Sequence, residues 1–451
     1  MNIPMRSLKI YFILAICTST AFAQMQGKTV PKAPLLTLKE AVEIALKNNY
    51  NIKLSANNNA IAKNNVTPGN AGMLPQVNAD VSSTNSIQDT KQTKVDASGN
   101  STETDIYGAH NSSWNYGLNL NWTIFDGFAM FANYDQLKAL NQLSQLTARD
   151  TIESTIADVI NTYYDLVNQD QQVKALKGAI EISRTQLRYA NDKFDVGRAS
   201  RLDVLNAQVN VNTDTSTLLT QIQQYKSIQI RMNQLMVRDL RTDFSVTDTI
   251  VIDEKMMLGD VINQAQTTSP TILISQLNHS IAEINLRQVK ATRYPVVGVN
   301  TGYGFTNSKT PAGFARSQNS KGLNYGLTAS INIFDGFNQN RKEKNAQIQI
   351  DNANLNLSKT KQAIEAQINN FYVSYLSGLD QVKLNQSNVG IAKRNLDISL
   401  EKYKLGNITP LEIREAQKNY LDAQSRYFQA QYQAKSAEIT LKEITNSINI
   451  Q

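Results

Sequence analysis

The sequence contains an internal duplication, and this feature constrains the fold more than any other. Around Gly197 the chain reads KFDVGRASRLDVLNAQ, and 209 positions later, around Gly406, it reads KYKLGNITPLEIREAQ. Each glycine lies between two long stretches with helical periodicity, where a chain reversal requires a residue with a positive φ. Each copy therefore predicts the tip of a helical hairpin, and the chain should contain two hairpins built to one plan.

The duplication extends well beyond the two tips. The same offset places the sequence Phe-Asp-Gly-Phe at 125–128 onto 334–337, whereas upstream, between Pro75 and Pro295, the offset is 220. The first copy thus has 11 extra residues after Pro75. Because insertions are tolerated where the backbone is solvated, an exposed loop is predicted over 82–113.

The repeat also sets the predicted domain boundaries. The first structural repeat, a strand pair followed by a helical hairpin, is assigned to 24–245, and the second to 258–451. A joint at 246–257 connects them, because the helical pattern is broken over 238–254. Within this joint, the apolar residues from Val246 to Ile252 predict a short strand.

The first 23 residues have the pattern of a secretory signal. Arg6 and Lys9 precede a short apolar run, and Ala21-Phe22-Ala23 fits a small-residue cleavage site. The only cysteine, Cys17, lies inside this segment, so the mature chain is expected to contain no thiol, disulfide or cysteine metal ligand. A lipid-modified Cys17 is the alternative reading of the same segment.

The net charge of +7 does not indicate a nucleic-acid partner. Lys and Arg are scattered among Asp and Glu, with no basic block and no interleaving of aromatic and basic residues. An enzymatic site is not expected either. His110 and His279 are the only histidines, and neither lies in a nucleophile motif or a phosphate-binding loop. We expect no cofactor and no metal site.

After Pro75 and Pro295 the hydrophobic period changes from 3.6 to 2. From Trp114 to Ile124 apolar residues alternate without a fault with Asn, Gly and Thr, and the segment Leu323 to Ile333 does nearly the same. Four strands of about ten residues are predicted, which is long enough to cross a bilayer when tilted. A soluble sheet would alternate too, but the uncharged polar face favours a water-filled lumen.

Long helices are predicted to follow each strand pair. Residues 128–196 and 337–405 contain no proline, and a helix of some 65 residues is about 100 Å long. Asp126 and Asp335 are predicted as their N-caps. Apolar residues at coiled-coil spacing indicate packing surfaces in both helices. They are Ile152, Ile156, Val159, Tyr163, Leu166 and Val173 in the first, and Ile364, Ile368, Phe371, Tyr375, Leu379 and Val382 in the second.

Taken in this order, the elements resemble the TolC family of outer membrane channel-tunnels over about residues 36–447. The resemblance is carried by the two Phe-Asp-Gly-Phe turns, by Leu74-Pro75 before a strand, and by the two glycine tips with their following Asp or Glu and Ala-Gln. It implies a membrane β-barrel plus all-α fold. Each chain would give four strands to a trimeric 12-stranded barrel, continued by a long periplasmic α-helical barrel. Four strands alone leave two open edges, which lipid does not permit.

The resemblance also implies a function and a location. The protein would lie in the outer membrane of a diderm bacterium, extend into the periplasm, and act as the passive exit duct of a tripartite efflux pump or a type I secretion system. Its partners would be two further copies of itself, a periplasmic adaptor (membrane fusion protein) and, through the adaptor, an inner-membrane transporter. A periplasmic coiled-coil adaptor or a structural secreted coiled coil are the alternatives, which two hairpins and four alternating strands disfavour. The cargo is not identified.

The resemblance assigns two kinds of site residue. Glu412 and Glu415 match acidic residues that ring the periplasmic gate of family tunnels, where six carboxylates per trimer would favour cations; a solvated helix face is the alternative. Asp203 and Tyr403 match a pair that links the coils of closed tunnels, while a basic residue of the family is replaced here by Ile408. The tips expected to dock the adaptor are Val196, Gly197, Arg198, Leu405, Gly406 and Asn407.

Overall fold

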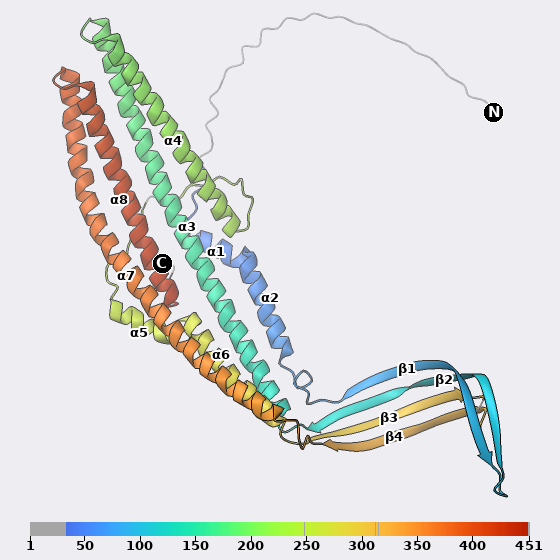
Figure 1. Ribbon diagram of the computed structural model, residues 1–451. Coiled ribbons are helices and arrows are strands. Elements are labelled where there is room, and N and C mark those ends of the chain that lie inside the picture. Colours follow the sequence, from blue (N-terminus) through green and yellow to red (C-terminus); the bar gives the residue numbers. More distant parts are fainter. Residues whose placement is uncertain (1–32, 248, 312, 314, 450–451) are drawn as a thin grey trace, which may run out of the picture.

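The computed structural model describes residues 33–449 apart from 248, 312 and 314, so the predicted signal over 1–23 lies outside it. The molecule is elongated, with two long helical hairpins at one end and a four-stranded sheet at the other (Figure 1). In the described part of the chain, no helix is both long and apolar enough to cross a membrane.

Six elements in the order helix, helix, strand, strand, helix, helix occur twice. The first set is α1 (Leu38–Asn48), α2 (Tyr50–Asn65), β1 (Gln76–Val95), β2 (Ser101–Phe125), α3 (Ala129–Asp195) and α4 (Arg201–Leu235). The second set is α5 (Leu258–Thr268), α6 (Pro270–Ala291), β3 (Val296–Lys309), β4 (Ser317–Ser330), α7 (Asn338–Leu405) and α8 (Pro410–Ile444). The boundaries at 24–245, 246–257 and 258–451 stay predictions.

The four strands form one antiparallel sheet in the order β1-β2-β3-β4. The register places Tyr116 opposite Phe305, with their rings stacked 4.9 Å apart, so the alternating apolar residues of different strands share one face. On the opposite face the Asn119 amide donates to Asp80 at 2.7 Å. The expected length of about ten residues was too short, because the strands contain 14 to 25 residues.

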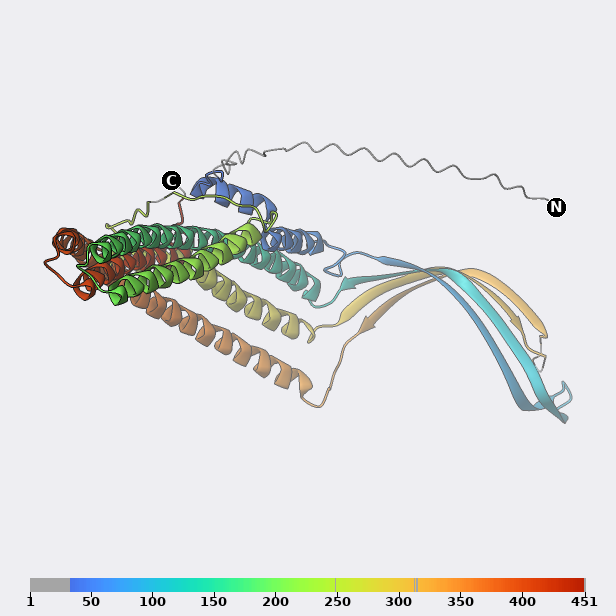
Figure 2. The ribbon, with the colours of Figure 1, turned by 90° about the horizontal axis from the view of Figure 1, so that it is seen from above.

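The loop expected over 82–113 is wrong. β1 and β2 stay paired as far as Val95 and Ser101, and only a tight turn joins them (Figure 2). In this turn the Asp96 carboxylate accepts from the N–H groups of Ser98 and Asn100, at 2.9 and 2.8 Å. Both faces of the extension are polar, so the sequence lacks the apolar alternation that identifies a half-buried strand. The inserted residues lengthen a hairpin.

A glycine turn connects each second strand to its long helix. Phe128 and Phe337 are the N-cap residues and have positive φ values of 70° and 62°, so Asp126 and Asp335 do not occupy the expected N-cap position. Each carboxylate nevertheless accepts a first-turn N–H, from Met130 at 2.8 Å in the case of Asp126. The predicted capping interaction is therefore present, but the aspartate that makes it lies two positions before the N-cap residue.

The helices form a curved layer whose outer members change along its length. Near the sheet the neighbours are α2-α3-α6-α7, and towards the tips they are α4-α3-α8-α7. α3 and α7 therefore run through both halves of the layer. The contact of α7 with α8 is very close, since a Cβ at Gly378 would lie 2.8 Å from the Cβ of Ala434. Buried alanines recur on α8 every seven residues, at Ala416, Ala423, Ala430 and Ala437.

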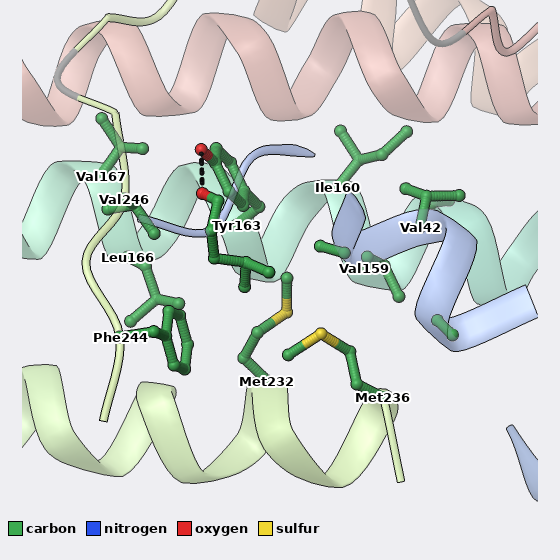
Figure 3. Close-up of a cluster of buried hydrophobic side chains, with 14 of the residues drawn as sticks. Val42, Val159, Ile160, Tyr163, Leu166, Val167, Met232, Met236, Phe244 and Val246 are labelled. Carbon is green, nitrogen blue, oxygen red and sulfur yellow. Dashed lines mark hydrogen bonds between the residues drawn. The ribbon is translucent and has the colours of Figure 1, made fainter. Parts of the chain in front are cut away.

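The largest apolar core lies where α1, α3, α4 and the connector after α4 meet (Figure 3). Tyr163 is buried there and its hydroxyl donates to the carbonyl of Leu36 at 3.0 Å. Val159, Tyr163 and Leu166 confirm the predicted packing stripe of the first long helix, and Ile368 and Tyr375 confirm that of the second. The strand expected from Val246 to Ile252 is wrong. Among the described residues of this segment, Val246 and Ile250 are buried and Ile252 is partly buried, and the bridge that the connector makes lies outside the segment, at Ser245 to Leu35.

Four carboxyl groups gather where the end of α8 meets α3. Burial, and then repulsion from Asp158, Asp150 and Glu153, raise the pKa of Glu443 to about 7. The same kind of burial raises the pKa of Glu153, where the Arg149 guanidinium opposes the shift. Glu443 therefore binds a proton in the folded protein at a pH where the unfolded chain has already lost it.

Mild acidification should stabilise the protein for this reason. Because the pKa of Glu443 is raised above its ordinary 4.5, the associated stability is fully present below about pH 4.5 and is lost as the pH rises through about 7. The thermal unfolding midpoint in detergent should be higher at about pH 5 than at pH 8, and Glu443→Gln should flatten this difference. Glu401→Gln, on an exposed part of α7, is the matched control. Equal slopes for both variants would contradict the assignment.

The turn between β1 and β2 should accept an inserted epitope tag next to Gly99. Gly99 has a positive φ of 85° and nothing lies within 4 Å of the position of a Cβ, so the turn has room. The tag should be reached by antibody on intact cells while transport continues. We expect this turn to face the outside of the cell, and detection only after the outer membrane is breached would contradict that orientation.

Candidate gate and docking site at the hairpin tips

Both hairpin tips have the same backbone structure. Gly197 and Gly406 have positive φ values of 74° and 83°, and nothing approaches within 4 Å of a Cβ at either position. The N–H of Arg198 donates to the carbonyl of Lys193 at 2.7 Å, and the N–H of Asn407 donates to the carbonyl of Lys402 at 2.9 Å. These bonds close a Schellman motif at each helix end, so glycine is required by the backbone angle and not by lack of space.

The return helices begin with matching capping boxes. Asp203 accepts from the Ser200 N–H at 2.9 Å, and Glu412 accepts from the Thr409 N–H at 2.7 Å. These hydrogen bonds hold the pKa of each carboxyl below its ordinary value. The two acids occupy the same position of the repeat. Two of the four expected gate residues therefore have a local structural role, which the sequence motif Ser/Thr-x-x-Asp/Glu could have revealed.

The expected acidic pair lies on the exposed side of the first turns of α8. Glu412 and Glu415 are both exposed, while Ile413 between them is fully buried against the neighbouring helices. Both carboxylates therefore face water in the single chain. This arrangement leaves them available to a lumen in an assembly, or to bulk solvent as the alternative reading has it.

A groove of about 580 Å³ separates the two tips and is lined by Lys193, Val196, Asp203, Tyr403 and Ile408, among others. Asp203 and Tyr403 are thus brought together, but among the described residues no hydrogen bond joins them. Burial, followed by the nearby Asp203 carboxylate, raises the pKa of the Tyr403 phenol.

Lys193 makes the direct link between the tips, and the sequence analysis missed it. Its ammonium donates to the Tyr403 carbonyl at 2.6 Å and lies 4.3 Å from the centre of the Tyr403 ring. Lysine at the end of α3 has a counterpart in Lys402, so the repeat offered no signal that one copy reaches across to the other hairpin. A cation over an aromatic ring favours this contact.

The two side edges of the helical layer carry apolar residues that are exposed in the single chain. On α7 they recur every seven residues, at Leu384, Ile391 and Ile398, which are 58% to 62% exposed. On the opposite edge they are Leu202, Leu205 and Val209 of α4, and Leu54 and Ile61 of α2. We call these two sets the α7 stripe and the α2/α4 stripe. Apolar stripes at heptad spacing are typical of helix-packing surfaces.

Comparison with known proteins identifies the same family in both halves of the chain. The family model described as "Outer membrane efflux protein" matches residues 41–237 and 261–447. The outer membrane protein TolC of Salmonella enteritidis is 20% identical over 353 residues, covering 77% of this chain and 72% of the relative. The outer membrane efflux protein BepC of Brucella suis is 21% identical over 332 residues, covering 73% of this chain and 71% of the relative.

Solved structures agree at the level of the fold. The CmeC outer membrane channel of Campylobacter jejuni has a TM-score of 0.75 at 18% identity, covering 91% of this chain and 85% of that one. The open state of the Neisseria gonorrhoeae MtrE outer membrane channel has a TM-score of 0.70 at 14% identity, covering 91% and 89%.

These matches decide between the alternatives. The predicted fold class, a membrane β-barrel to which each chain gives four strands and which long helices continue as a tunnel, is confirmed. The predicted outer membrane location and the role as an exit duct for efflux are confirmed as well. The family consists of channel-tunnel proteins and not of enzymes. The chain belongs to the outer membrane efflux protein family.

Proposed function

We propose that three copies of this chain close into one duct, which has no catalytic step of its own. The observation that carries the proposal is the pair of open sheet edges, on β1 and β4. In lipid every backbone N–H and C=O at such an edge needs a partner, and only closure supplies it for all strands. Pairing of β1 with β4 of the next copy closes the sheet, and three copies give the twelve strands that the resemblance to the channel-tunnel family implies.

The exposed stripes support the same assembly along the helices. The open edges of the helical layer lie on the same sides as those of the sheet, with β1, α2 and α4 on one side and β4 and α7 on the other. The α7 stripe of one copy then packs on the α2/α4 stripe of the next. Each large apolar side chain buried this way contributes about 1.5–3 kcal/mol.

At the periplasmic end, Glu412 and Glu415 of three copies form a ring of six carboxylates. Charges about 4 to 8 Å apart interact by one to several kcal/mol at an effective dielectric near 20, so the ring attracts cations and repels anions. The contact of Lys193 with Tyr403, in the groove that Asp203 also lines, holds the two tips of each chain close to each other. This contact keeps the ring narrow in the resting state.

The tips are also the proposed docking surface for a periplasmic adaptor. Val196 and Leu405 project as exposed apolar residues beside Arg198 and Asn407, with Gly197 and Gly406 setting the backbone reversal. Small exposed apolar anchors with polar neighbours are typical of transient interfaces. The adaptor would connect the duct to an inner-membrane transporter of an efflux pump or of a type I secretion system.

Charged substitutions in the α7 stripe should prevent assembly. Ile391→Glu with Ile398→Glu places two carboxylates in each chain-to-chain contact, and burial without a partner costs several kcal/mol per charge. Crosslinking in mild detergent should show trimers for the wild type and mainly monomers for the variant. Gln386→Glu lies on an exposed part of α7 outside the stripe and is the matched control. Trimers of unchanged abundance in the double variant would refute the proposed contact.

Ion selectivity tests the carboxylate ring. Glu412→Gln with Glu415→Gln removes the six charges while glutamine can still close the capping box. In reconstituted bilayers this variant should lose most of the cation selectivity and block by divalent cations. Glu401→Gln is the control. If the double variant has the same selectivity and block as the wild type, Glu412 and Glu415 lie on a solvated helix face and do not ring the pore.

A further inference from the structure

A polar cluster joins the two hairpins of one chain at some distance from the tips. The Arg414 guanidinium on α8 donates to both carboxylate oxygens of Asp214 on α4, each at 2.8 Å. Ser183 of α3 donates to the same carboxylate, and the Gln417 amide donates to Ser183 at 2.8 Å. The Gln186 amide donates in turn to Gln417 at 3.0 Å. Three helices from both hairpins are thus held by one network.

The network is sheltered from water. The side chain of Asp214 is 8% exposed and that of Arg414 is 26% exposed. Ser183, Gln186 and Gln417 are buried. A bidentate guanidinium–carboxylate pair is strongly directional, and when it is buried it specifies one relative position of the two helices that carry it.

The positions that the repeat relates to Arg414 and Asp214 cannot form a second network of this kind. Leu205 occupies the position that matches Arg414, and Ala423 occupies the position that matches Asp214. Leu205 belongs to the α2/α4 stripe, which faces the neighbouring chain in the proposed trimer. At the level of this cluster the seam between the hairpins of one chain is therefore polar, whereas the matching position in the proposed seam between chains is the apolar Leu205. Parting the polar seam exchanges protein hydrogen bonds for hydrogen bonds to water, whereas parting an apolar seam exposes hydrocarbon.

We propose that Arg414 and Asp214 are the positioning residues of the gate, because their paired charges fix the start of α8 against α3 and α4 and so set the resting aperture. Arg414 lies between Glu412 and Glu415 in the sequence, so movement of this turn moves both carboxylates. The inference rests on the proposed function of that turn as the narrowest part of the duct. Opening then occurs along the three polar seams, while the apolar seams between chains stay closed.

Single-channel conductance of the purified full chain in planar bilayers tests this role. Arg414→Met and Asp214→Leu each leave one buried partner unpaired, and each should raise the mean conductance about twofold or more through a wider mouth. The double exchange Arg414→Asp with Asp214→Arg, or the apolar pair Arg414→Met with Asp214→Leu, should return the conductance towards the wild type. Arg426→Met, at an exposed position of α8, is the matched control. The abundance and heat resistance of the trimer should not change in any variant.

The inference would be overturned if the single variants Arg414→Met and Asp214→Leu had the conductance of the control Arg426→Met. It would also be overturned if their conductance were raised and neither double variant lowered it again, or if the conductance rose only in variants whose trimers dissociate. The selectivity of the Glu412 and Glu415 variants reports separately on the ring itself. A wild type that forms no cation-selective channel would remove the proposed function, whereas a normal channel indifferent to Arg414 and Asp214 would remove only this inference.

Discussion

The structure depends on one constraint, which is that the chain presents unpaired edges to a solvent that cannot satisfy them. β1 and β4 end the sheet, and within hydrocarbon their free N–H and C=O groups have no water to bind. The two edges of the helical layer also lack a packing partner in the single chain, because the α7 stripe and the α2/α4 stripe leave apolar side chains uncovered. A single chain is therefore a segment of a cylinder wall, and its shape becomes stable when copies of it close the circle.

The internal duplication supplies the repeating units of that wall, and the differences between the copies supply its functional asymmetry. α3 and α7 run from the sheet to the tips, while α2 and α6 accompany them in one half and α4 and α8 in the other. The Glu438 carboxylate on α8 is only 1% exposed and is paired with Lys435 at 2.9 Å and Lys442 at 2.7 Å on the same helix. It also accepts the N–H of Asp253 at 3.0 Å, and this bond fixes the connector between the copies. The copies differ most in the long β1–β2 hairpin and in the polar seam at Arg414.

Much of the fold could be predicted because the chain repeats strong local signals. The first long helix, expected over 128–196, occurs at Ala129–Asp195, since a long stretch without proline and with regular apolar spacing has few alternatives. The hairpin extension was missed because strands with two polar faces lack an apolar period. The connector strand was predicted from three apolar residues, Val246, Ile250 and Ile252, which instead pack singly against the helical core.

The site was less predictable because its contacts join residues that are far apart in the chain. The positions of Glu412 and Asp203 follow from the repeat, and their capping boxes are local. The contact of Lys193 with Tyr403 and the pairing of Arg414 with Asp214 span some 200 positions each. Only the three-dimensional packing of the hairpins brings these groups together.

The central claim, that the open edges are closed by assembly of three chains into one barrel, is tested most directly by the native mass of the wild-type protein in mild detergent. The account predicts a single protein species with three times the mass of the mature chain. A membrane-embedded species with the mass of one chain, folded and stable, would contradict it.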